Sequence, residues 1–133
     1  MTSEVKLKTG GDPRSLPDYA ALRDEISKLT HPARPDVDWR YVETLCLRLY
    51  EHNGVELQTQ VCYVLAITRR QGLAGMADGL GSLDILLQRW ADFWPVQVHS
   101  RISLLSWVTE KMQQALRTLD IQYQDLPQIY RCV

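Results

Sequence analysis

The side chains that most often do chemistry in proteins are sparse in this sequence. Three histidines occur, and each stands beside an expected helix end, where capping or surface roles are usual: His31, His52 and His99. No G-x-S-x-G motif places a nucleophile on a sharp turn. Neither H-E-x-x-H nor C-x-x-C provides a metal-ligand spacing. We therefore predict no catalytic residue, no metal site and no cofactor.

The cysteines also argue against chemistry. Cys46, Cys62 and Cys132 are odd in number and irregular in spacing, and the first two lie among apolar residues. This pattern is typical of buried free thiols that pack as small hydrophobic side chains. Because no disulfide framework is indicated, we predict a reducing compartment and a cytoplasmic location.

A run of glycines after Gly72 invites comparison with a phosphate-binding loop. No predicted strand precedes the run, and no Lys-Ser or Lys-Thr pair follows it to hold phosphate and magnesium. Glycine costs a helix interior up to about 1 kcal/mol, so several in one helix need a reason. We predict that Gly75, Gly79 and Gly81 allow close approach of a neighbouring helix; the alternative is a frayed start of their own helix.

Composition indicates one globular domain. The chain has 133 residues, of which 45% are hydrophobic and 23% charged, and its formal net charge is -1. That near balance argues against a nucleic-acid binder, which needs a dominant basic face. No apolar run approaches the length of a membrane span, and residues 1–12 lack the apolar centre of a signal peptide.

Apolar residues recur at three- and four-residue spacings, which is the pattern of amphipathic helices. Five helices are expected, over residues 17–29, 38–53, 56–72, 75–94 and 100–119, and residues 125–130 suggest a short sixth. We predict an all-α fold, a compact bundle of five to six mostly antiparallel helices. A flexible lead-in over residues 1–12 would precede a helical domain over residues 13–131.

The last long helix has a clear predicted core face. Its members are Ile102, Leu105, Val108, Met112, Leu116 and Leu119. Trp39 and Trp90 lie on the apolar stripes of earlier helices, so we place both in the core. Trp94 stands at a helix end before proline, and Trp107 lies off the stripe of its helix. These two tryptophans are therefore our candidates for contact with a partner.

Several segments, taken in order, resemble the ImpA N-terminal domain. They are residues 11–14 (GDPR), 17–19 (PDY), 36–43 (DVDWRYVE), 54–58 (GVELQ), 72–75 (GLAG), 79–80 (GL), 93–95 (FWP) and 99–101 (HSR). The resemblance covers roughly residues 10–130 and is strongest to the TagA-like subgroup, whose members carry a VasL-type C-terminal region. Pro13 stands where an aliphatic residue is more usual in the wider family.

The resemblance implies a function that the residue chemistry does not. Proteins of this TssA-like family act in assembly of the contractile tail of the bacterial type VI secretion system. TagA-like members are linked with capping the distal end of the sheath and holding the extended tail. The implied partners are sheath, tube or baseplate proteins; self-association stays open, and we expect this stretch to be part of a longer chain.

Two rival hypotheses come from other functional classes. The chain could be a helical hydrolase or ligand-binding domain whose site forms in a cleft between helices. It could also be a helical nucleic-acid adaptor with a local basic patch. A deep cleft lined by carboxylates or histidines with perturbed pKa values would favour the first rival, and binding to DNA or RNA would favour the second.

Overall fold

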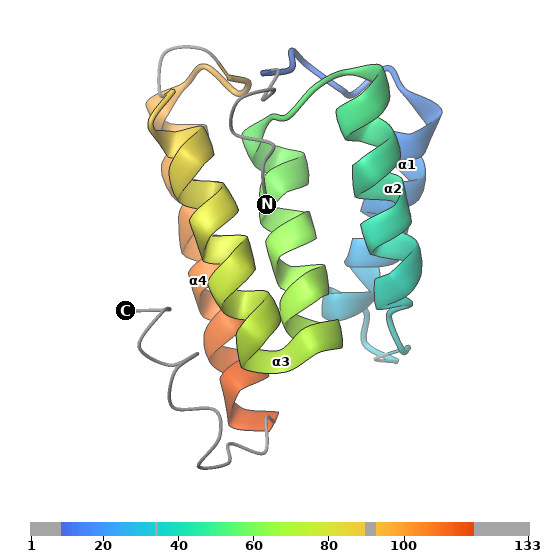
Figure 1. Cartoon of the computed structure of the whole chain (residues 1–133). Coiled ribbons are helices and arrows are strands. Elements are labelled where there is room, and N and C mark those ends of the chain that lie inside the picture. The colour runs from blue at the N-terminus through green and yellow to red at the C-terminus, as the bar shows by residue number, and fades with distance from the viewer. Residues whose placement is uncertain (1–8, 34, 90–92, 119–133) are drawn as a thin grey trace.

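The computed structural model of the chain describes residues 9–33, 35–89 and 93–118. Four α-helices and a short 3-10 helix lie in this part of the chain (Figure 1): α1 (Pro17–Ile26), η2 (Ser27–Thr30), α2 (Trp39–His52), α3 (Leu57–Leu87) and α4 (Val98–Thr118). The described residues contain no strand, and their one pairing of extended backbone is an isolated bridge between Thr9 and Val55. The prediction of an all-α fold is confirmed.

Local sequence signals explain where the first two helices begin and end. Pro17 occupies the first turn of α1, where its missing N–H removes no helical hydrogen bond. The Asp38 carboxylate accepts a hydrogen bond from the backbone N–H of Tyr41 at 3.1 Å, which caps α2. The chain leaves α2 through Gly54, whose φ of 107° is rarely adopted by other residues.

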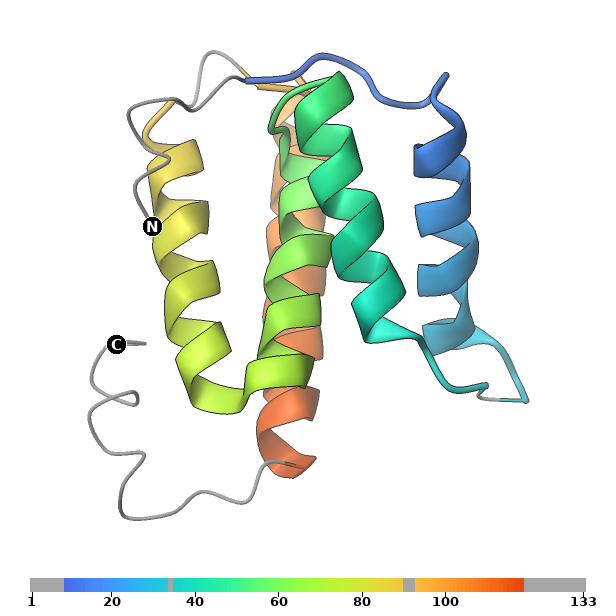
Figure 2. The ribbon, with the colours of Figure 1, turned by 45° about the vertical axis from the view of Figure 1, so that its right-hand side comes forward.

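The predicted third and fourth helices form one element, α3. At Gly72 the backbone takes φ 67° and ψ -143°, and the chain folds back on itself within this single residue. The first arm (residues 57–71) and the second arm (residues 73–87) then run antiparallel, side by side (Figure 2). The predicted count of five to six helices is wrong, because a one-residue turn replaces the loop that we expected. The predicted short helix over residues 125–130 lies outside the described residues, as does Trp90.

Two of the three glycines in the second arm of α3 allow close packing. A Cβ built on Gly75 would clash with the backbone carbonyl of Ile67. A Cβ on Gly79 would lie 3.0 Å from a methyl carbon of Val64. The prediction of close helix approach is therefore confirmed for Gly75 and Gly79. It is wrong for Gly81, where an added Cβ would meet nothing within 4 Å.

The first arm of α3 forms the centre of the core. Its residues 59–68 are all buried except Tyr63, which is half-buried. α2 and α4 both pack on α3, and α1 packs on α2. Trp39 lies half-buried against this core, in agreement with its predicted place. No helix in the described part of the chain is long and apolar enough to cross a membrane.

Candidate protein-binding surfaces

Three segments that are distant in sequence meet at one end of the bundle, which we call the junction: residues 9–12, 53–57 and 93–95. Gly10 donates a backbone hydrogen bond to Val55 at 2.7 Å, and Leu57 donates one to Trp94 at 3.0 Å. The N–H of Trp94 in turn donates to the carbonyl of Gly10 at 3.4 Å. The last part of the predicted lead-in is thus hydrogen-bonded to two loops.

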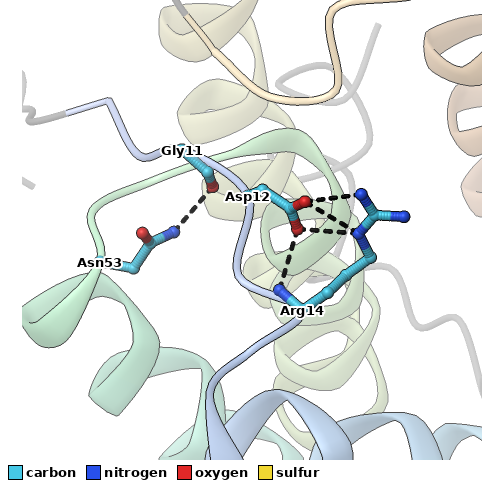
Figure 3. A network of polar contacts seen from close by, with 4 residues as sticks. All are labelled: Gly11, Asp12, Arg14 and Asn53. Atoms are coloured by element: carbon cyan, nitrogen blue, oxygen red, sulfur yellow. Dashed lines mark hydrogen bonds and ion pairs between the residues drawn. The ribbon is translucent and has the colours of Figure 1, made fainter.

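Asn53 adds a side-chain hydrogen bond to the junction. Its Nδ2 donates to the carbonyl of Gly11 at 2.9 Å (Figure 3). Gly10 lies so close that an added Cβ would come within 2.8 Å of the same Nδ2 and 2.9 Å of the Asn53 carbonyl oxygen. Such contact leaves room for glycine and for no larger residue unless the backbone moves.

α4 holds the junction through a buried arginine. Arg101 is only 3% exposed, and its Nε donates to the Pro95 carbonyl at 2.6 Å. Its Nη2 donates to the Phe93 carbonyl at 2.7 Å, and the guanidinium lies 4.2 Å from the centre of the Phe93 ring. These charge-assisted bonds fix the loop that carries the cis Trp94–Pro95 bond.

A second buried charged group at the junction is Glu56, which lies fully buried at the start of α3. Its carboxylate accepts hydrogen bonds from the N–H groups of Gln58 (2.6 Å) and Thr59 (2.9 Å) and from the Thr59 hydroxyl. Burial raises the pKa of Glu56 to about 7, although the bonds from Thr59 and Gln58 act in the opposite direction. The carboxylate serves as a helix cap, because all these partners lie in the first turn of α3.

Trp94, the first predicted partner-binding residue, lies half-buried in the junction. The Arg14 guanidinium lies 5.4 Å from its ring centre and is itself paired with Asp12, with 2.6 Å between Nη2 and Oδ2 (Figure 3). Just beyond Trp94 the side chain of Val96 is 69% exposed. One face of the indole is therefore covered by the arginine, while the following loop presents apolar surface.

Trp107, the second predicted residue, is half-buried in a different place, on α4. It lines a groove of about 380 Å³ between α1 and α4, which we call the α1–α4 groove. The groove is lined by Tyr19, Leu22, Arg23, Ile26, Ser27, Leu29, Thr30, Gln58, Cys62, Ser103, Leu104 and Trp107. Trp94 is not among these residues, so the structure does not bring the two tryptophans into one site.

A third surface was not predicted. On α4, Ile102 is 55% exposed and Leu116 is 37% exposed, with Val98 also exposed and Leu105 half-buried beside them. We call these four residues the outer flank of α4. The predicted core face is therefore correct for Val108 and Met112, and Leu105 packs half-buried against the core as well. It is wrong for Ile102 and Leu116, and Leu119 lies outside the described residues.

The reason for this error is Arg101. The residues of α4 that face the core are Arg101, Val108, Met112 and Ala115. Because the first of these positions is a charged residue, the core-facing residues of α4 do not form a continuous apolar stripe in the sequence. If Arg101 is counted as a core residue, the predicted core face shifts around the helix and Ile102 lies outside it.

The remaining candidates for chemistry lie apart from one another. His31 accepts a hydrogen bond from the Ala33 N–H at 3.1 Å and is exposed, as are His52 and His99. Burial raises the pKa of the Cys62 thiol to about 12, so the reactive thiolate is disfavoured. Among the described residues, no group of three His, Cys, Asp or Glu side chains could hold a metal ion.

Comparison with known proteins gave one match. The sequence model of the family described as "ImpA, N-terminal, type VI secretion system" matches residues 4–110, which is most of the chain. No curated protein and no solved structure matches. The matched range includes the junction, both predicted tryptophans and the α1–α4 groove.

Proposed function

Because this chain belongs to the ImpA N-terminal family of the type VI secretion system, we propose that it is a non-catalytic protein-binding domain of an assembly protein of that system. Its partners would be sheath, tube or baseplate proteins in the cytoplasm. The domain would help to assemble, cap or hold the contractile tail. Within the family we assign it to the TagA-like subgroup with a VasL-type C-terminal region, on the motifs quoted above.

The observation that carries this proposal is the outer flank of α4. Val98, Ile102 and Leu105 follow one another at spacings of four and three residues, so they form one row on the helix. Ile102 and Leu105 also line the same shallow hollow. Val98 and Ile102 are exposed, while Leu105 is half-buried against the core. Exposed aliphatic side chains beside one another on a helix support a contact surface for another protein.

Pull-down of purified sheath, tube and baseplate subunits by the chain tests the proposal. We expect one of them to bind and Ile102→Glu to weaken that binding, because a carboxylate would enter the apolar contact. Leu47→Glu on α2 is the matched control, since Leu47 is an exposed apolar residue on another helix. Failure of all the purified subunits to bind would overturn the proposal.

The assignment to the TagA-like subgroup has its own test. We expect the full protein, carrying a fluorescent label, to gather at the end of the sheath that lies away from the baseplate. A label that stays at the baseplate throughout sheath extension would instead favour a baseplate role within the same family.

One observation favours a second candidate, binding of a small ligand between helices. The α1–α4 groove has a volume within the range of ligand clefts. Its described lining contains no carboxylate and no histidine, and its one thiol is Cys62. The groove therefore supports binding better than hydrolysis, for which a general acid or base would have to lie in the cleft.

A further inference from the structure

The α1–α4 groove is open because its two walls pack on different neighbours. α1 packs on α2, and α4 packs on α3. Both helices lie on the far side of the molecule in Figure 1, and the first arm of α3 runs between them. Gln58 and Cys62 of that arm form the floor. The groove is thus a channel between two parallel helices with a third helix beneath it.

The walls of the groove are mainly apolar. α1 contributes Tyr19, Leu22 and Ile26, while α4 contributes Leu104 and Trp107. Tyr and Trp are the side chains most often found at the energetic centre of protein interfaces. Successive apolar side chains of an amphipathic helix, at i, i+3 or i+4 and i+7, fit a trough of this kind.

The charged side chain in the described lining of the groove is a cation. Arg23 lies on the α1 wall, is exposed, and forms no ion pair with any other described residue. By contrast, the nearby Lys28 is already paired with Glu25 at 2.8 Å. A cation beside an apolar trough favours a partner that brings a carboxylate to it.

We infer that the α1–α4 groove binds an amphipathic helix of a partner protein, with apolar side chains against Leu104 and Trp107 and a carboxylate opposite Arg23. This inference rests on the proposed function of the chain as a protein-binding domain. It adds a second contact surface to the outer flank of α4 and states the chemistry of its partner.

The probe is a set of overlapping peptides, each about 20 residues long, which is about 30 Å as a helix. The peptides cover the sequences of the sheath, tube and baseplate subunits, and binding to the full chain is measured by fluorescence anisotropy. We expect the peptides that bind to be amphipathic and acidic. Replacing their carboxylate opposite Arg23 by lysine should weaken binding on the order of tenfold.

Three substitutions in the chain locate the bound peptide. Trp107→Ala should weaken binding about 30-fold, as removal of a central interface tryptophan does. Ser103→Tyr, at an exposed wall position, should block the groove without removing any core contact. Arg23→Glu should weaken binding of the acidic peptide and restore binding of its lysine variant. Leu47→Glu, at an exposed position of α2 outside the groove, is the control and should leave peptide binding unchanged.

The outcomes separate this inference from the proposed function. If an intact subunit binds but no peptide does, and Ser103→Tyr leaves the subunit bound, the inference fails while the proposed function stands. If peptides bind only after residues 119–133 have been removed, the groove is occupied by that segment of the same chain and not by a partner, and the inference is overturned. A dimer that Trp107→Ala dissociates, or a peptide insensitive to Arg23→Glu, would also overturn it.

Discussion

At the junction, three chain segments meet around buried polar groups that have their hydrogen-bond partners within the fold. Arg101 bonds to two carbonyls, and Glu56 caps the first turn of α3. The α1–α4 groove is built differently: apolar side chains line an open space of about 380 Å³, and its cation Arg23 has no ion pair in the described part of the chain. The junction satisfies its own polar groups, whereas the groove leaves apolar surface and charge for something else.

This difference separates the residues that hold the domain together from those that we expect to bind a partner. A substitution at the junction should lower the free energy of unfolding and leave the affinity of the folded domain unchanged. A substitution of an exposed groove residue should leave the free energy of unfolding unchanged and lower the affinity for a partner, whereas the buried lining residues Tyr19, Leu22 and Cys62 also belong to the core.

The largest effect is expected from Arg101→Met. The variant removes two charge-assisted hydrogen bonds from buried carbonyls, which together correspond to about 4 kcal/mol of unfolding free energy. Urea denaturation followed by tryptophan fluorescence measures this loss. Arg117→Met, at an exposed position of the same helix, is the control. Equal stability of the two variants would show that Arg101 does not hold the junction.

Glu56 should make stability depend on pH. Its pKa is about 7 in the folded chain and 4.5 in the unfolded chain, so the folded state keeps its proton to higher pH. The contribution of Glu56 to stability is therefore fully present below pH 4.5 and is lost as the pH rises through 7. The gap between the two pKa values corresponds to about 3 kcal/mol.

Glu56→Gln removes this titration while keeping an oxygen acceptor for the helix cap. The unfolding free energy of the parent minus that of the variant should fall between pH 5 and 8, as measured by urea denaturation at about four pH values. Glu51→Gln, at an exposed position of α2, is the control variant. A constant difference for Glu56→Gln would mean that the pKa of Glu56 is ordinary.

Two adjacent glycines provide a matched pair at the junction. Gly10→Ala should lower the unfolding free energy by about 2 kcal/mol, because its Cβ would press on the Asn53 and Gly54 backbone. Gly11→Ala should change it by less than about 0.5 kcal/mol, since an added Cβ there meets nothing within 4 Å. Thermal denaturation of the two variants measures this difference. Similar unfolding temperatures for Gly10→Ala and Gly11→Ala would contradict the tight packing of Gly10.

The smallest effect on stability is expected in the groove. Ser103→Tyr should change the unfolding free energy by less than about 0.5 kcal/mol, because Ser103 is exposed on the α4 wall. The same denaturation measurement checks this value. A loss as large as that of Gly10→Ala would show that the groove wall belongs to the packed core, which would remove the contrast between the two regions.

Helix positions were predictable from the sequence because apolar spacing and end signals agree along most of the chain. Asp38 caps α2 and Pro17 begins α1, as their residue types predicted. The helix count was not predictable in this way, because nothing in the pattern distinguishes a loop from the reversal of direction at Gly72. The single residue Gly72, with its positive φ, ends one arm of α3 and begins the other without an intervening loop.

The surfaces were harder to predict than the helices. Ile102 and Leu116 have the residue types of a core, and only the inward position of Arg101 shows that they lie outside. Trp107 lies at a groove because α1 packs on α2 whereas α4 packs on α3. Local sequence patterns do not predict which helices pack together. The pairing of residues 9–12 with loops far along the chain was missed for the same reason.

The junction also determines the order in which the domain is completed during synthesis. The paired helices and the folded arms of α3 make contacts close in sequence, so they can form while the ribosome is still translating. Gly10 must wait until Trp94 has emerged before its carbonyl finds a donor. We therefore expect the bonds of Gly10 and Gly11 to Val55 and Asn53 to be possible early, and the junction to close fully only after the loop that carries Trp94 has been synthesised.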